Sequence, residues 1–396
     1  MEENDVYVVD FKRTAFSRAR PNEPEKDVFN SIRMDQALAQ LIRTIVEEND
    51  IAEGEIGDVI TGCALQVDEN WLYGGRHPVL LAKLPVSVPS VAMDRACASS
   101  MNAAALGSFE IMTGHSDIVL AGGMEHMTHV PMANNPHIAV NMRLLLRPEY
   151  MKYQMNIGYV MGLTAEKLAE ETGITREEMD RYSLESHRRA ASSYDQGWYK
   201  DEIIPMNVEV EGKEVTVDRD LSIRQETSME QLSKLPPAFK DNGVITAGNS
   251  SPLNSGASML LLVSGKKVKE SGLKPLAKIL GFGWAGVEPS VMGRGPVPAT
   301  MKALRKVDLN IDMVERWEIN EAFAVVVLNA IKELSLDPSK VNVHGGAIAI
   351  GHPLGASGAR LIGTLARQLH EEGKEYGVAT LCVGGGQGFT TVLQRA

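Results

Sequence analysis

The chain has 396 residues and a formal net charge of −11 at pH 7, so it lacks the basic footprint that non-specific nucleic-acid binding needs, and no nucleic-acid partner is expected. Its length exceeds what one ordinary hydrophobic core supports, which predicts two or more domains. Its three cysteines form no CxxC pair, which argues against a disulfide framework or a cysteine-rich zinc site.

The same cysteines and the first residues indicate the cellular setting. A few cysteines without a pairing pattern are typical of a reducing compartment. The opening MEENDVYVVDF is acidic and runs into an apolar stretch, unlike a secretory signal. No apolar run reaches the length of a membrane span. We therefore expect a cytoplasmic protein without membrane insertion.

Strands and helices alternate in the first part of the chain. The apolar run 6–11 predicts a buried strand, and an amphipathic pattern predicts a helix near 34–49. Further strands are predicted over 58–66, 90–96 and 117–123, with a helix over about 99–113 that Gly114 closes. This alternation is typical of α/β proteins.

The C-terminal part repeats this order. It predicts a strand over 316–320, a helix over 321–334, a segment 341–348 that leads to the glycine-rich loop GHPLGASG, a helix over 358–369, a strand over 376–386 and a last strand over 389–394. CVGGGQG joins the last two strands directly, which predicts a hairpin. The repeated order indicates an internal duplication with a long period.

The two copies differ in the length of one connection. In the first copy, about 125 residues separate the strand that ends near 123 from its expected partner strand at 255–264. This difference predicts an insertion, which contains a helix at 164–173 and another at 175–194. Thr175 and Glu178 form a capping-box pattern at the start of the second helix. Since such sheets bind ligands at the carboxyl ends of their strands, the insertion is expected to lie above such an end.

Cys97 stands among small residues in RACASS, where a helix is predicted to begin. A helix N-terminus favours a thiolate, which is the nucleophilic form of cysteine, so the position predicts a lowered pKa for this thiol. The alternative is a small buried hydrophobic residue, the commoner role of a lone cysteine. In the second half, the equivalent positions carry His352 in GHPLGASG and Cys382 before three glycines. A base and a second thiol at the same sheet edge favour catalysis.

Six stretches in family order resemble the thiolases, the acetyl-CoA C-acyltransferases. They are RACASS, GGMEHM, TAGNSS, NEAFA, GGAIAIGHPLGASGAR and CVGGGQG. The resemblance implies the duplicated α-β-α-β-α layered fold of thiolases with an inserted loop domain. It also implies three parts: an N-terminal half over 1–123 and 251–273, a CoA-binding loop domain over 124–250, and a C-terminal half over 274–396.

The resemblance assigns catalytic roles residue by residue. Cys97 corresponds to the nucleophile that is acylated, and His352 to the histidine that activates it and lines an oxyanion hole. Cys382 corresponds to the cysteine that moves the proton at carbon 2. Asn320 corresponds to the residue that holds a water in that oxyanion hole, and its type also suits a helix N-cap. The backbone N–H groups of Cys97 and Gly384 would form the second hole.

The resemblance also assigns substrate contacts. Ser251 corresponds to a serine at the pantetheine arm, and Arg224 lies where thiolases place an arginine against the CoA adenine. Further candidates for substrate contact are Met161, Met292, Ala247 and Phe323. Coenzyme A enters as a substrate, and no tightly bound cofactor is expected. His126 and His129 have no carboxylate or thiol spaced to complete a metal site, so none is predicted.

The implied activity is CoA-dependent thiolysis of 3-ketoacyl-CoA, with the reverse condensation. Val160 replaces the histidine of the YHMG stretch in short-chain members, which favours a degradative 3-ketoacyl-CoA thiolase. The alternative is a short-chain acetyl-CoA acetyltransferase that forms acetoacetyl-CoA. Cys382 argues against a ketoacyl synthase on the same fold, and no reactive group is lost as in a non-catalytic acyl-CoA-binding relative.

Family members assemble, so a homodimer or homotetramer is expected. Closed two-fold symmetry is also the commonest arrangement among soluble oligomers. A multienzyme partner in fatty acid β-oxidation, for which the chain would be a subunit, stays open.

Overall fold

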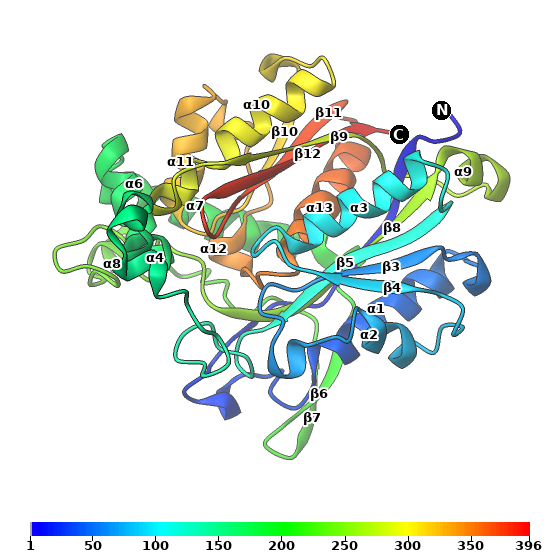
Figure 1. The fold of residues 1–396 in the computed structure, drawn as a ribbon, viewed down its shortest axis with the longest axis horizontal. Helices are drawn as coiled ribbons and strands as arrows, with labels where there is room; N and C mark the ends of the chain where they lie inside the picture. The colour runs from blue at the N-terminus through cyan, green and yellow to red at the C-terminus, as the bar shows by residue number, and fades with distance from the viewer. Residues whose placement is uncertain (1) are drawn as a thin grey trace.

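The computed structural model describes residues 2–396, and its centre is a ten-stranded mixed sheet (Figure 1). The strand order is β10-β11-β12-β9-β1-β8-β5-β3-β4, and β2 pairs with β8 off this path. The strands are β1 (Val6–Arg13), β2 (Ser17–Arg18), β3 (Asp58–Gly62), β4 (Ser90–Met93), β5 (Ile118–His126), β8 (Asn254–Ser264), β9 (Ala277–Gly286), β10 (Arg316–Ile319), β11 (Tyr376–Val383) and β12 (Gln387–Arg395).

The sheet consists of two halves that repeat the same pairing. In the N-terminal half, β4, β3 and β5 run parallel, and β8 and β1 follow antiparallel. In the C-terminal half, β10 and β11 run parallel, and β12 and β9 follow antiparallel. The halves meet where Val6–Val8 of β1 pairs with Ala277–Ile279 of β9. The predicted duplication is therefore present, although β9 itself was not predicted from the sequence.

Helices complete five layers around the two half-sheets (Figure 1). The central layer is α3 (Ser99–Met112) with α13 (Ser357–Glu372), and the outer layers are α1 (Met34–Glu48) with α2 (Arg76–Leu81) and α10 (Pro296–Lys306) with α11 (Ala324–Glu333). Strand β1 shows how the layers are built, because Val6 and Val8 pack in the central core and Tyr7 and Val9 in the outer one. The predicted α-β-α-β-α fold is confirmed.

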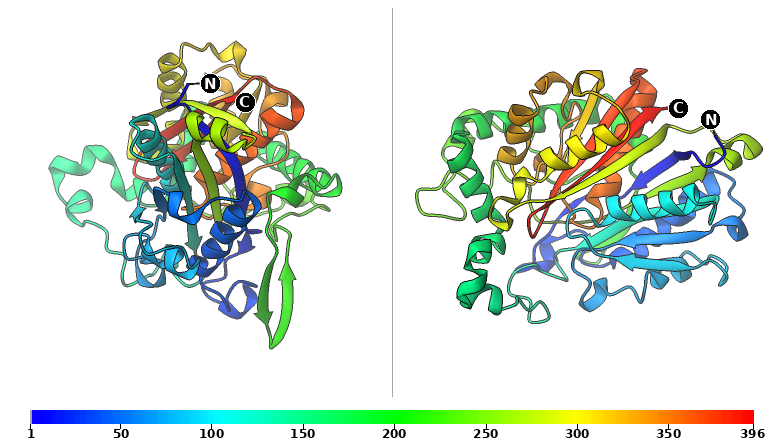
Figure 2. Two further views of the ribbon diagram at one scale, coloured as in Figure 1. Left: turned by 90° about the vertical axis from the view of Figure 1, so that its right-hand side faces the viewer. Right: turned by 45° about the horizontal axis from the view of Figure 1, so that its top comes forward.

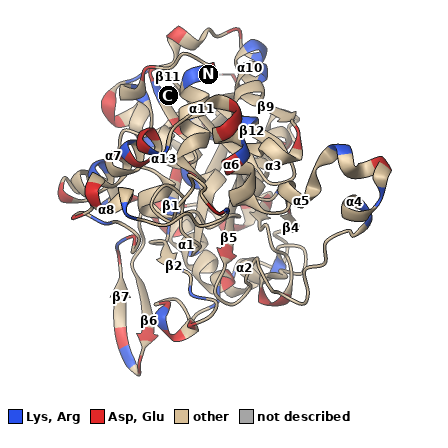
Figure 3. Cartoon of the chain, turned by 90° about the vertical axis from the view of Figure 1, so that its left-hand side faces the viewer, with Lys and Arg blue, Asp and Glu red and all other residues tan. Residues whose placement is uncertain are grey.

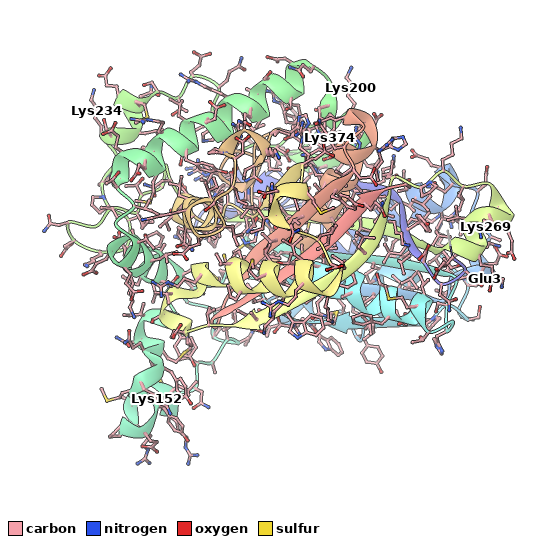
Figure 4. All side chains as sticks on the ribbon, turned by 90° about the horizontal axis from the view of Figure 1, so that it is seen from above. Glu3, Lys152, Lys200, Lys234, Lys269 and Lys374 are labelled. Atoms are coloured by element: carbon pink, nitrogen blue, oxygen red, sulfur yellow. The ribbon has the colours of Figure 1, made fainter. Side chains whose placement is uncertain are left out.

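A long segment leaves the sheet after β5 and returns at β8. It carries α4 (Arg143–Leu146), α5 (Met155–Gly158), α6 (Met161–Thr172), α7 (Arg176–Asp195), the hairpin of β6 (Met206–Val210) and β7 (Lys213–Val217), and α8 (Met229–Ser233). The two helices predicted here are α6 and α7, and the capping box of Thr175 and Glu178 is present. The part around α4 projects from the body, with Lys152 on it (Figures 2 and 4).

The outer surface of this segment mixes charges of both signs. Acidic and basic residues lie close together on α7 and on the projecting part (Figure 3). Pairs such as Arg181–Glu177 and Lys234–Glu230 join neighbouring turns. Two short helices complete the fold, α9 (Gly265–Ser271) and α12 (Ala347–Ile350). No helix within residues 2–396 combines the length and apolar character that crossing a bilayer requires.

The close contact of α3 with α13 generates a stability prediction. A side chain at Gly358 would overlap the backbone and Cβ of Met101 on α3. Gly358→Val should therefore lower the free energy of unfolding by about 1–3 kcal/mol, the usual cost of overpacking. Gly54→Ala is the control, because a Cβ at Gly54 meets nothing within 4 Å. Chemical denaturation of both variants measures the difference, and equal stabilities would contradict the contact.

Candidate active site

The loop that carries Cys97 holds an unusual backbone conformation between β4 and α3. Ala96 has a φ of +43°, a left-handed value that non-glycine residues seldom adopt. The Ala96 N–H donates to Asp94 Oδ1 at 2.5 Å, and the Ser99 hydroxyl donates to the Ala96 carbonyl at 2.7 Å. The Arg95 N–H in turn donates to Ser99 Oγ at 2.9 Å. These bonds hold Cys97 in a fixed place before the helix.

Loss of solvation is the largest influence on the thiol of Cys97, which is half-buried. It raises the pKa of Cys97 to about 11, although the Gly384 N–H and the Cys97 N–H, both directed at the sulfur, lower it. The negative charges of Glu125 and Asp94 raise it further. This direction is opposite to the predicted lowering by a helix N-terminus, because Cys97 precedes the first helical residue, Ser99, and the loss of solvation outweighs the N–H groups.

Cys382 lies near the end of β11, fully within the protein. Only 1% of its surface is exposed. Burial raises the pKa of the Cys382 thiol, and a negative charge on Cys97 raises it further, so the charges of the two thiols interact. After Cys382, the chain turns at Gly385 and Gly386, where φ is +81° and +84°. The Gly384 N–H just before this turn is directed at the Cys97 sulfur.

His352 lies in the loop between α12 and α13 and is held at three points. Its backbone N–H donates to Asn254 Oδ1 at 2.8 Å. Its Nδ1 lies 2.6 Å from Ser357 Oγ, and its Nε2 lies 3.3 Å from Asn320 Nδ2. Burial and the nearby positive charge of Arg360 lower the pKa of His352 to about 3. The imidazole is therefore neutral at pH 7 and able to accept a proton.

Asn320 follows the last residue of β10 and faces the imidazole. Its backbone N–H donates to the Thr380 carbonyl at 3.0 Å, which continues the sheet ladder. The helix predicted over 321–334 begins only at Ala324, with Phe323 as its N-cap, so the alternative role of Asn320 as N-cap is wrong. Among the described residues, its buried Oδ1 has no hydrogen-bond partner. This oxygen can accept a hydrogen bond from a bound molecule.

Three predicted substrate residues share one apolar cluster with Cys382. Met292 and Phe323 are buried in it, and Met161 packs against it from the start of α6. The Met161 sulfur lies 3.8 Å from the point that a Cβ on Gly384 would occupy. The structure therefore brings these side chains to the thiols.

The other predicted substrate residues lie farther out. The Ser251 N–H donates to the Ala322 carbonyl at 3.0 Å, so the loop with exposed Ala247 and half-buried Ser251 lies beside NEAFA. Arg224 is exposed on a separate loop and lines a groove with Leu232. The Arg224 N–H donates to His187 Nδ1 at 3.2 Å, and burial together with the Arg224 charge lowers the pKa of His187 to about 4.

Glu125 of the GGMEHM stretch is fully buried, and it links the two halves of the chain. Its Oε2 accepts hydrogen bonds from the N–H groups of Ala64 and Gly355, both at 2.9 Å. Its Oε1 accepts from the Leu65 N–H and the Asn70 amide, both at 3.1 Å. Burial raises the pKa of Glu125 to about 7, although these bonds lower it. The residue ties the His352 loop to the N-terminal half.

His126 and His129 gain a carboxylate neighbour that their spacing did not reveal. Glu69 Oε1 lies 2.7 Å from His129 Nδ1, and the three side chains place ligand atoms within 4.8 Å of one another. The two imidazole rings stack at 3.7 Å with an angle of 9° between them. Because the rings are parallel, their in-plane lone pairs point side by side and do not converge on one metal ion. Each ring nitrogen also already has a hydrogen-bond partner. The cluster is a satisfied polar network.

Comparison with known proteins agrees with the fold and the motifs. Residues 6–266 match the model of the thiolase N-terminal domain, and residues 273–395 match that of the thiolase C-terminal domain. The chain is 41% identical over 395 residues to a 3-ketoacyl-CoA thiolase of Psychrobacter sp. (strain PRwf-1), with 99% of this chain and 98% of the relative covered.

Solved structures give the same result. Human mitochondrial 3-ketoacyl-CoA thiolase in complex with CoA superposes with a TM-score of 0.88 at 34% identity, covering 100% of this chain and 99% of the other. The acetyl-CoA acetyltransferase of Bacillus anthracis superposes with a TM-score of 0.87 at 34% identity, covering 99% of both chains. The chain belongs to the thiolase family. The predicted family and acyltransferase class are confirmed.

The raised pKa of Cys97, about 11, predicts how its alkylation depends on pH. Because the thiolate is the form that reacts, the rate with iodoacetamide should keep rising from about pH 7 to about pH 10, past the ordinary cysteine value of about 8.5. Peptide mass mapping at each pH measures the modification of Cys97, with N-acetylcysteine as the reference thiol. A rate that levels off below about pH 8 would reveal a stabilised thiolate instead.

Proposed function

We propose that the chain is a 3-ketoacyl-CoA thiolase that works through an acyl group on Cys97. The observation that carries this proposal is the pair of interacting thiols, Cys97 and Cys382, together with a buried imidazole, His352, that Ser357 and Asn320 hold at its two ring nitrogens. Thiolysis needs a nucleophile to take the acyl group and a separate acid–base group for the proton at carbon 2. The site offers both.

In the first step, Cys97 attacks the 3-keto carbon. His352 Nε2 accepts the proton of the Cys97 thiol as the carbon–sulfur bond forms, because the raised pKa keeps the thiol protonated at rest. The bond between carbons 2 and 3 then breaks, and the acyl group stays on Cys97. His352 Nε2 and the Asn320 side chain, which lie 3.3 Å apart, face one developing oxyanion. The N–H groups of Cys97 and Gly384 face the other.

Cys382 handles the proton at carbon 2. The leaving carbanion of acetyl-CoA takes the Cys382 proton, which its raised pKa keeps available. In the second half of the reaction, the Cys382 thiolate takes the proton of incoming CoA, whose sulfur attacks the acyl group on Cys97. The thiol of Cys97 is then restored by the proton held on His352. A negative charge on Cys97 raises the pKa of Cys382, which favours a state in which only one of the two thiols is deprotonated at a time.

The inserted segment 124–250 is proposed to bind CoA. The solved human relative holds CoA, and its fold matches this chain over its full length. We place Ser251 near the pantetheine arm and Arg224 near the adenine, since Ser251 adjoins NEAFA and Arg224 lines an exposed groove. The flanking parts, 1–123 with 251–273 and 274–396, supply the catalytic loops.

Acetylation of the enzyme tests the proposed function. Incubation with acetyl-CoA followed by peptide mass mapping should place the acetyl group on Cys97. Cys97→Ser should lose nearly all activity, because a hydroxyl lacks the nucleophilicity of a thiolate. Cys63→Ser is the matched control, since Cys63 is a buried thiol of the outer core. Acetyl found on Cys63 or Cys382 alone would overturn the assignment.

Chain length distinguishes the degradative enzyme from the short-chain alternative. Val160 is 42% exposed and directly precedes Met161 of the apolar cluster. If this apolar position faces the acyl chain, each buried methylene adds up to about 0.8 kcal/mol, which favours six carbons over four by roughly tenfold in kcat/KM. Val160→His should shift the preference toward four carbons.

A series of 3-ketoacyl-CoA substrates measures this preference. The control is Val215→His on the β6–β7 hairpin, because Val215 is similarly exposed, at 39%. Activity confined to acetoacetyl-CoA across the series would refute the long-chain preference and favour an acetyl-CoA acetyltransferase.

A homo-oligomer is the proposed state of assembly. Strand β4 ends the sheet order, so its outer edge presents unpaired backbone groups to a second copy. Exposed Trp71 and Tyr73 lie in the loop just before Gly75, which packs on the β4 residue Val91. Sedimentation at about micromolar concentration should show a dimer or tetramer. An active species of only 43.1 kDa would contradict it.

A further inference from the structure

An imidazole acts as a base only through the nitrogen that carries no proton. Neutral histidine has two tautomers, and the hydrogen bond made by one nitrogen decides which nitrogen is free. The proposed base, His352, is 4% exposed, so protein groups and not solvent choose its tautomer. The groups that contact its two ring nitrogens are therefore decisive.

Ser357 contacts the Nδ1 side of this ring. Its hydroxyl donates to the Pro353 carbonyl at 2.8 Å, one turn back along the chain. Because the only proton of the hydroxyl is used in that bond, Ser357 Oγ offers a lone pair to His352 Nδ1, 2.6 Å away. Ser357 has no exposed surface, so no solvent contact competes. This arrangement requires a proton on Nδ1.

The Nε2 side gives an independent indication of the same tautomer. Asn320 Nδ2, an amide donor, lies 3.3 Å from His352 Nε2, a geometry that suits an unprotonated Nε2. The partner of Nδ1 is a neutral hydroxyl and not a carboxylate, and Arg360 adds positive charge nearby. An imidazolium at this position is therefore poorly stabilised and returns its proton readily.

We infer that Ser357 is a positioning residue that fixes His352 as the Nδ1–H tautomer and so keeps Nε2 unprotonated and able to accept the proton of Cys97. This inference rests on the proposed role of His352 as base. In acylation, the Cys97 proton moves to Nε2 while Nδ1–H stays bonded to Ser357 Oγ. In deacylation, the proton returns from Nε2 to the Cys97 sulfur, and Ser357 is unchanged throughout.

Ser357→Ala removes the acceptor for Nδ1–H and should lower kcat by about 10- to 100-fold with little change in KM, less than the roughly 100- to 10,000-fold that a general base itself contributes. The matched control is Ser258→Ala. Ser258 is equally buried and donates to the Ala356 carbonyl of the same loop at 2.5 Å, without touching the imidazole. Ser357→Thr keeps the hydroxyl and should restore most of the activity. Thermal unfolding of each variant separates loss of function from loss of fold.

Nitrogen-15 NMR of the histidine-labelled protein reads the tautomer directly, with His352→Asn used to assign the signal. The wild-type spectrum should show a protonated Nδ1 and an unprotonated Nε2, and Ser357→Ala should shift the populations. A wild-type Nε2–H tautomer, or a kcat of Ser357→Ala equal to that of Ser258→Ala, would overturn the inference. Full activity of His352→Ala would instead refute the proposed base, so the two failures are distinguishable.

Discussion

The site depends on the close packing of α3 against α13 in the central layer. Gly358 lies on the backbone of Met101, and the Ala359 N–H donates to Ser100 Oγ at 2.9 Å. Because both helices begin beside each other, the loops before them meet, and these loops carry Cys97 and His352. The second thiol, Cys382, lies on β11, which packs against α13. Residues about 255 positions apart in the chain are thus brought to the same end of the central layer.

Burial then sets the chemistry of every titratable group in this site. It raises the pKa of both thiols and of Glu125 and lowers that of His352 to about 3. These directions favour the uncharged forms of Cys97, Cys382 and His352 in the resting site. In the proposed mechanism, a thiol loses its proton when substrate provides a carbonyl for the sulfur to attack, and the backbone N–H groups of Cys97 and Gly384 stabilise the negative charge that then develops on the carbonyl oxygen.

The sequence predicted the parts of the site that depend on repeated local pattern. The alternation of strands and helices in both halves predicted that Cys97, His352 and Cys382 lie at equivalent edges of the two half-sheets. The layered fold agrees with this predicted duplication. The strand β9 was missed because glycines at 281, 283 and 286 weaken its apolar pattern. The start of α11 was placed three residues early because Glu321 and Ala322 are good helix formers, whereas Glu321 is held by Tyr182 and Ser186.

Contacts between distant segments could not be predicted from one sequence. Glu125 meets Gly355 across 230 positions, and Glu69 meets His129 across 60. Neither pair shares a helix turn or a strand register. The raised pKa of Cys97 was missed for a related reason, since a helix-start pattern is visible locally but the burial that outweighs it is tertiary.

Separate roles for the two thiols are tested most directly by exchange of the methyl protons of acetyl-CoA in deuterated water, measured on Cys382→Ser together with acetylation of Cys97. If Cys97 takes the acyl group and Cys382 moves the proton, the variant acetylates Cys97 as the wild type does but loses the exchange. Exchange at the wild-type rate in Cys382→Ser would show that another base moves the carbon 2 proton and would contradict the division of labour between the two cysteines.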